Sequence, residues 1–149
     1  MSSAGCVRKV CALGALVVVL GGLTACVNSP AGPTRFAPYS QTDLRLGTGP
    51  AVVSGDLITV HYTGWFYEDG QPEQKGAVFE TSRSGTPLQL SVGSSGVIFA
   101  WNQGLPGMQP GGLRRLVVPP SVGYGGFRTG PIPPWTTLVF EIELVSIDE

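Results

Sequence analysis

The sequence has few of the side chains that most enzymes use for chemistry. Its 149 residues include three cysteines and one histidine, His61, and only 13% of the residues are charged. Cys6 and Cys11 lie in a segment that we expect to be removed, so the exported chain would keep Cys26 alone and could form no intramolecular disulfide. A structural zinc site needs about four Cys or His ligands. We therefore expect no metal site, and we expect no cofactor.

The chain also lacks an excess of positive charge. Its formal net charge is −1, and without the first 25 residues it has seven basic and ten acidic side chains. Proteins that bind nucleic acids present a basic surface to the phosphates. We therefore expect no nucleic-acid partner.

No apolar run is long enough to span a bilayer comfortably. The longest run, residues 10–23, follows Arg8 and Lys9. Its last residue begins the string "LTAC", which ends at Cys26. A basic flank, a short apolar stretch and small residues before a cleavage point are typical of a signal peptide. "LTAC" resembles the bacterial lipobox, which implies a signal peptide over residues 1–25 and acylation of Cys26. An uncleaved membrane anchor or an ordinary secretory signal is the alternative.

The rest of the chain divides into a tether and one domain. Residues 26–40 are rich in Pro, Ser, Ala and Gly without apolar periodicity, which is typical of a flexible linker. Residues 41–149 have the length of one domain with a single core. In this arrangement a lipid anchor on Cys26 would hold the domain at the extracytoplasmic side of a bacterial membrane.

Apolar residues alternate with polar ones along several short segments of the domain. Alternation with a period of two predicts half-buried strands, here in "DLITVHYTG", "PLQLSVG", "LRRLVVP" and "TLVFEIELVSI". Residues 97–105, "VIFAWNQGL", place Ile98, Trp101 and Leu105 on one helical face. Antiparallel strands around one short helix predict an α+β fold.

His61 and its neighbour Tyr62 are expected on opposite faces of one strand. Successive strand residues point to opposite sides of a sheet, and Tyr62 shares its side with Ile58 and Val60. The alternation therefore predicts that Tyr62 faces the interior and that His61 is an exposed residue without a catalytic role.

Five strings of the domain identify a family resemblance. "VHYTG", "FETSR", "GVIFAW", "GYG" and "IPPWTTLVFEIELVSI" resemble, in order and nearly in spacing, the FKBP-type peptidyl-prolyl cis/trans isomerases. The resemblance extends from about Thr42 to the C-terminus. It implies an antiparallel half-barrel sheet wrapped around one short helix, with an apolar pocket between them, and isomerase activity on X-Pro bonds.

The resemblance also implies a role for each matched residue. Trp101 would form the floor of the pocket. The other implied site residues are Tyr62, Phe79 and Phe140 in the walls, Val97 and Ile98 at the edge, Tyr124 at the rim, and Glu80. The Ile98 N–H would donate to a substrate carbonyl, and the Tyr124 hydroxyl would bond near the rim. The implied partners are proline-containing polypeptides and macrolides of the tacrolimus and rapamycin type, bound by a monomer.

Several departures from the family pattern affect these expectations. The segment "SRSGTP" is shorter than in the human prototype, Leu88 stands where that prototype has Phe, and Pro131 disturbs the apolar rim before Ile132; these changes bear most on macrolide affinity.

Glu80 stands where the family usually has Asp, and its carboxylate is expected to reach the Tyr124 hydroxyl. Residues 65–78 are about seven residues longer than the corresponding segment of the family's human prototype. Their composition predicts a solvated loop or a bulge at the sheet edge, with a dedicated partner site as the alternative.

Three functions fit the sequence to different degrees. The first is an exported, lipid-anchored isomerase that assists the folding of cell-envelope proteins. The second is a module that keeps the pocket and binds proline-containing segments with little catalysis. A hydrolase fits poorly, because the only histidine is predicted to face away from the pocket.

Overall fold

The computed structural model describes residues 36–148. The predicted signal peptide, Cys26 and most of the predicted tether lie outside the described residues. Within residues 36–148, no helix has the length and apolar character needed to cross a bilayer.

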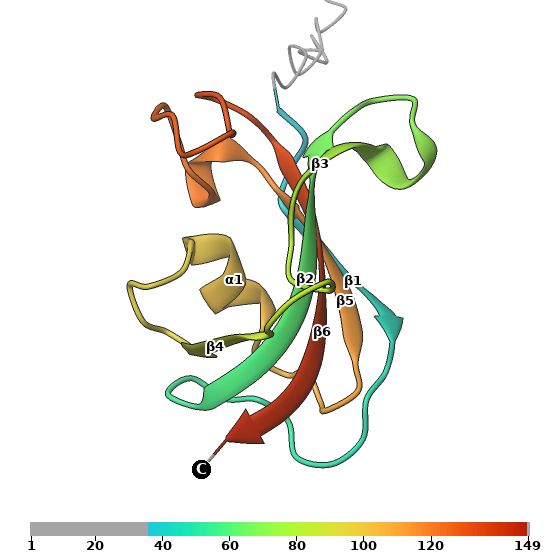
Figure 1. Cartoon of the computed structure of the whole chain (residues 1–149), viewed down its shortest axis with the longest axis vertical. Coiled ribbons are helices and arrows are strands. Elements are labelled where there is room, and N and C mark those ends of the chain that lie inside the picture. The colour runs from blue at the N-terminus through green and yellow to red at the C-terminus, as the bar shows by residue number, and fades with distance from the viewer. Residues whose placement is uncertain (1–35, 149) are drawn as a thin grey trace, which may run out of the picture. The chain divides into compact units, whose positions relative to one another are not determined.

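The described chain forms one antiparallel sheet with a short helix packed on it (Figure 1). The strands are β1 (Ser40–Arg45), β2 (Leu57–Tyr67), β3 (Lys75–Thr81), β4 (Leu88–Ser91), β5 (Leu113–Val118) and β6 (Leu138–Asp148), and the helix is α1 (Phe99–Gly104). Two 3-10 turns occupy Pro72–Gln74 and Pro120–Val122. The strand order is β1-β5-β6-β2-β3, with β4 also paired to β2. This confirms the predicted α+β fold.

The core follows the predicted alternation along the two longest strands. Ile58 and Val60 of β2 and the residues Leu138, Phe140, Ile142 and Leu144 of β6 are buried against α1. Glu141 and Glu143 point away from the core, as predicted, but neither is simply solvated. Each forms two ion pairs on the outer face of the sheet: Glu141 with Lys75 and Arg115, Glu143 with Arg45 and Arg83.

The helix is shorter than the predicted segment 97–105. Ile98 is its N-cap in an extended conformation, so Val97 and Ile98 lie before the first turn. The helix can lie close to β5 because Gly104 has no side chain, since a Cβ there would lie 2.7 Å from Leu116 Cδ2. The buried Arg114 holds its end, because Nη1 donates to the Gly104 carbonyl at 2.7 Å while Nε pairs with Asp43. These contacts fix the position of Trp101.

The predicted tether ends earlier than residue 40. Tyr39 packs against the core, Ser40 begins β1, and the Phe36 ring stacks on Trp135 with centroids 6.5 Å apart. No periodicity marks residues 36–40, because these contacts are made with residues distant in the chain.

The long segment 65–78 is strand at both ends and an exposed loop over residues 68–74. Its ends continue β2 to Tyr67 and begin β3 at Lys75, with register shifts between the two strands that mark bulges. Lys75 pairs with Glu73 and lies 4.6 Å from the centroid of the Trp65 ring. The segment therefore shows both predicted features, an exposed loop over residues 68–74 and bulges between the strands at the sheet edge.

Candidate functional site: an aromatic cavity between the sheet and the helix

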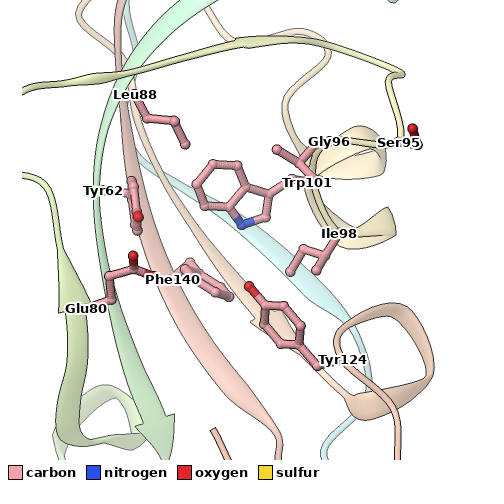
Figure 2. A pocket seen from close by; sticks show the side chains of 10 residues that line it. Tyr62, Glu80, Leu88, Ser95, Gly96, Ile98, Trp101, Tyr124 and Phe140 are labelled. Carbon is pink, nitrogen blue, oxygen red and sulfur yellow. The ribbon is translucent and has the colours of Figure 1, made fainter. Parts of the chain in front are cut away.

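A cavity of about 340 Å³ opens between α1 and the sheet (Figure 2). Ten residues line it: Tyr62, Glu80, Leu88, Ser95, Gly96, Val97, Ile98, Trp101, Tyr124 and Phe140. They come from β2, β3, β4, β6, α1 and the segments that precede α1 and β6. Residues separated widely in the sequence thus meet at one hollow.

Three aromatic rings make the closed end of the cavity. Trp101, the first core aromatic of α1, is 4% exposed and packs edge-on against Tyr62 and Phe140, with centroid separations of 5.1 and 5.5 Å. Perpendicular contacts of this kind place the positive edge of one ring on the face of another. The result is a rigid apolar floor and wall.

Phe79 lies one layer behind this wall. Its ring meets Phe140 at 5.7 Å and Phe66 at 5.3 Å, and it does not line the main cavity. It lines an adjoining hollow of about 280 Å³, which shares Glu80 and Tyr124 with the main cavity. The prediction that Phe79 is a wall of the pocket therefore needs correction: Phe79 supports Phe140 and borders the neighbouring hollow.

The position of Phe79 depends on Gly64 of β2, which pairs with Glu80, so that Phe79 is the unpaired residue at a bulge between β2 and β3. A Cβ on Gly64 would lie 2.5 Å from Phe79 Cζ, a distance at which one of the two must move. The glycine of "HYTG" therefore makes room for the aromatic ring of "FETSR", and the two strings belong to one packing unit.

Glu80 pairs with Tyr62 and not with Tyr124. Burial and a hydrogen bond from the Tyr62 hydroxyl to the Glu80 carboxylate raise the pKa of Tyr62 to about 12. The pKa of Tyr124 is raised mainly by burial, with only the charge of Glu80 added, and no hydrogen bond joins the two. The predicted Glu80–Tyr124 pairing is wrong in this structure.

Three donors at the cavity have no partner among the described residues. They are the backbone N–H of Ile98, the Tyr124 hydroxyl and the buried indole N–H of Trp101. Figure 2 shows the Tyr124 hydroxyl directed toward the centre of the cavity and the Trp101 nitrogen on the side that faces Ile98 and Tyr124. A ligand that carries carbonyl oxygens could engage such donors.

His61 lies on the opposite face of β2 from the cavity, as predicted. Its Nδ1 is 3.2 Å from Ser82 Oγ, and Ser82 Oγ also accepts from the Tyr62 N–H at 2.9 Å. His61 is half-buried and not exposed as predicted, because β3 and the Ser82 turn cover part of its ring.

Sequence reasoning left two lining residues, Ser95 and Gly96, unassigned and treated Leu88 only as a departure from the family pattern. Leu88 belongs to β4, where alternation with Leu90 predicts an inward side chain, so a signal was present. Ser95 and Gly96 lie in the irregular segment before α1. No periodicity extends through that segment, and only the folded chain brings it to the cavity.

Comparison with known proteins places this cavity in a family. The family model described as FKBP-type peptidyl-prolyl cis-trans isomerase matches residues 49–145. A relative named FK506-binding protein from Neisseria meningitidis serogroup B is 41% identical over 109 residues, which cover 72% of this chain and 94% of the relative. FK506-binding protein 1 of Aspergillus oryzae is 39% identical over 106 residues, or 68% and 91% of the two chains.

Solved structures agree with the sequence relatives. The crystal structure of AtFKBP13 superimposes with a TM-score of 0.63 and 35% identity, over 74% of this chain and 93% of that one. A peptidyl-prolyl cis-trans isomerase from Pseudomonas syringae gives a TM-score of 0.60 and 33% identity, over 74% and 76%. Both identities are high enough for the shared fold to carry information on the site.

Proposed function

The chain belongs to the FKBP-type peptidyl-prolyl cis-trans isomerase family, and on that basis we propose that it is an exported, lipid-anchored isomerase that assists folding in the bacterial cell envelope. The observation that carries the activity is the cavity floored by Trp101, closed by Tyr62 and Phe140, and edged by unengaged donors. A prolyl ring is apolar, and the carbonyls beside it are acceptors. The cavity offers a complement to both.

The reaction needs a pocket more than it needs a reactive group. Rotation about an X-Pro bond faces a barrier of about 18–20 kcal/mol, because resonance gives the C–N bond partial double-bond character. The planar imide is more charge-separated than the twisted one, so removing water favours the twisted state. Binding the twisted state more tightly by about 5–6 kcal/mol would accelerate exchange roughly ten-thousandfold.

Each side chain then has a physical task. The rings of Trp101, Tyr62 and Phe140 take the prolyl ring and exclude water from the imide. The Ile98 N–H and the Tyr124 hydroxyl hold carbonyl oxygens on either side of it, so that rotation is confined to one bond. Tyr62 is itself held by its hydrogen bond to Glu80.

The tyrosines of the cavity serve as donors and not as bases. The pKa of Tyr62 is raised to about 12 and that of Tyr124 is raised above its usual value, in both cases chiefly because burial disfavours the phenolate. Both hydroxyls stay protonated at neutral pH. Proton transfer is accordingly no part of the proposed mechanism.

Export and anchoring rest on the N-terminal sequence. Arg8 and Lys9, the apolar residues 10–23 and the lipobox-like "LTAC" ending at Cys26 support cleavage before Cys26 and acylation of its sulfur. The site would then face the extracytoplasmic side of a membrane, where exported chains fold. We expect a monomer that binds proline-containing segments and, in the same cavity, macrolides of the FK506 type.

Metabolic labelling with a fatty acid tests the anchoring. Cys26→Ser should abolish incorporation, because the thiol is the atom that is acylated. Cys6→Ser and Cys11→Ser are matched controls that should keep the label, since both lie in the cleaved segment. Label retained by Cys26→Ser, or lost in a control, would contradict the proposed lipobox.

A binding module with weak catalysis is the second candidate. Glu80, where the family usually has Asp, favours it, since one extra methylene changes how Tyr62 is held. The two candidates differ in one measurement, the rate of X-Pro exchange in the presence of the folded protein.

A further inference from the structure

Three aromatic side chains gather at the surface, beside the isomerase cavity. Trp135 is 58% exposed and Phe127 is 80% exposed, both from the segment between β5 and β6. Phe36, the first described residue, stacks on Trp135. We call Phe36, Phe127 and Trp135 the aromatic patch.

The fold holds the patch together and outward. The Trp135 N–H donates to the Gly125 carbonyl at 2.8 Å, and a Cβ on Gly126 would lie 2.7 Å from the Trp135 ring. Phe127 follows Gly126 directly, so its backbone lies close to the Trp135 ring, and its own side chain is 80% exposed. Trp135 also has φ +58, a conformation that non-glycine residues rarely adopt. The backbone conformation of the turn and the hydrogen bond to Gly125 therefore fix the position of the exposed indole.

The surroundings of the patch carry few charges: one hollow that borders Phe36 and Trp135 contains the Asp69 carboxylate, which accepts from the Tyr67 hydroxyl, and the other sides are apolar. Between Pro119 and Thr137 the sequence has one charged residue, Arg128, and no carboxylate. An apolar hollow of about 470 Å³ beside the patch is lined by Phe36, Ala37, Pro38, Tyr39, Pro119, Pro120, Ser121, Val122 and Trp135. The outer face of the sheet is different, because it carries the ion pairs of Glu141 and Glu143.

The patch lies where the chain departs toward Cys26. Only nine residues separate Cys26 from Phe36, and even a fully extended chain of that length reaches no more than about 35 Å. Phe36 contacts Trp135 directly. If Cys26 is acylated, the aromatic patch consequently lies beside the point where the anchored segment joins the domain and within reach of the bilayer.

We propose that the aromatic patch docks on the lipid surface and orients the isomerase cavity beside the membrane; this inference rests on the proposed anchoring. Tryptophan is favoured at the bilayer interface, where one part of the ring is apolar and the N–H remains wet. Arg128 adds a charge that anionic headgroups attract, and no carboxylate of this segment has to lose water on docking.

Docking would define which substrates the enzyme meets. The segment that carries Phe127 and Trp135 also carries Tyr124 of the main cavity, and Thr129 to Ile132 of the adjoining hollow. Figure 1 shows this segment, between β5 and β6, at the same end of the domain as the start of β1. The preferred substrates would be X-Pro bonds of polypeptide segments held at the membrane surface.

Fluorescence quenching in vesicles tests the docking without relying on natural acylation. Residues 26–149 contain the whole core and a single cysteine, so the Cys26 thiol can be coupled to a maleimide phospholipid in vesicles of phosphatidylcholine and phosphatidylglycerol. Brominated acyl chains then quench any indole that enters the interface. Trp101 is 4% exposed, and Trp65 lies beneath Lys75, so we assign the quenchable signal to Trp135.

The expected result is quenching that Trp135→Phe removes. Phe127→Ser should lower the ratio of docked to undocked protein about tenfold, because burial of one aromatic side chain is lost. Leu46→Ser is the matched control: Leu46 is 77% exposed and follows β1, in the segment that Figure 1 shows at the opposite end of the domain. It should leave the quenching unchanged.

Two outcomes would overturn the inference. Coupled wild type whose emission is insensitive to bromine would mean that the patch stays in water, and natural acylation could still occur. Self-association in solution that Phe127→Ser abolishes, without any quenching, would make a second copy the occupant. If Cys26 is not labelled in cells but the coupled protein is still quenched in vesicles, the anchoring is refuted and the lipid affinity of the patch is established.

Discussion

The hydrogen bond from Tyr62 to Glu80 makes a quantitative prediction about the site. Tyr62→Phe removes the donor but keeps the ring that packs on Trp101 at 5.1 Å. Glu80→Gln removes the charge of the acceptor and keeps its length. The two variants and their combination form a double-mutant cycle, which isolates the pair from the other effects of each change.

The expected coupling energy is about 1 kcal/mol. A hydrogen bond to an ionised group contributes about 1.5–3 kcal/mol when it is shielded, but Tyr62 is only half-buried, so solvent screening reduces the value. Each single variant should then lower kcat/KM for an X-Pro peptide about fivefold. Glu80→Asp tests the length of the side chain that carries the acceptor. It should raise kcat/KM if the shorter side chain holds the Tyr62 hydroxyl better.

A protease-coupled isomerisation assay gives kcat/KM, and urea unfolding gives the stability of the same four proteins. The matched cycle replaces Tyr62→Phe by Tyr124→Phe, for which no hydrogen bond to Glu80 exists in the structure. That cycle should be additive to within about 0.5 kcal/mol. Coupling of Glu80 to Tyr124 with none to Tyr62 would refute the geometry described here.

Three further predictions address packing, the histidine and pH. Gly64→Ala should destabilise the domain by about 1–3 kcal/mol in urea unfolding, because the new Cβ meets the Phe79 ring at 2.5 Å; unchanged stability would show that the ring moves freely. His61→Gln should leave kcat/KM within about twofold, and a large loss in a folded variant would reopen acid-base chemistry. The raised pKa values of Tyr62 and Tyr124 stabilise the fold fully below about pH 10, the unfolded value, and this contribution is lost as pH rises through about 12 for Tyr62. Thermal denaturation should therefore begin to show falling stability above about pH 10, with kcat/KM nearly flat from about pH 6 to about pH 9.

The strands could be predicted because burial follows a period of two. Ile58 and Val60 in β2 and Phe140 in β6 lie where alternation places them. Arg114 is buried on the same side of β5 as Leu116, although arginine is rarely buried. Its partners, Asp43 and two carbonyls near the end of α1, come from distant parts of the chain that periodicity does not connect.

Site details that depend on side-chain reach could not be predicted. The resemblance identified Glu80, but whether its carboxylate meets Tyr62 or Tyr124 depends on the register of β2 and β3, which contains bulges. Phe79 lies behind Phe140 for the same reason. The packing of Phe36 on Trp135 has no local signal, because the two residues lie at opposite ends of the domain sequence.

The central claim is that the cavity above Trp101 catalyses rotation of X-Pro bonds. Magnetisation-exchange NMR of a short X-Pro peptide with residues 26–149 measures cis–trans exchange and, in the same sample, the Trp101 indole N–H. The account predicts that the protein accelerates exchange and that the peptide shifts the Trp101 resonance. When an FK506-type macrolide fills the cavity, the acceleration should stop and added peptide should no longer shift Trp101. Peptide binding that shifts Trp101 in the folded protein without accelerating exchange would contradict it.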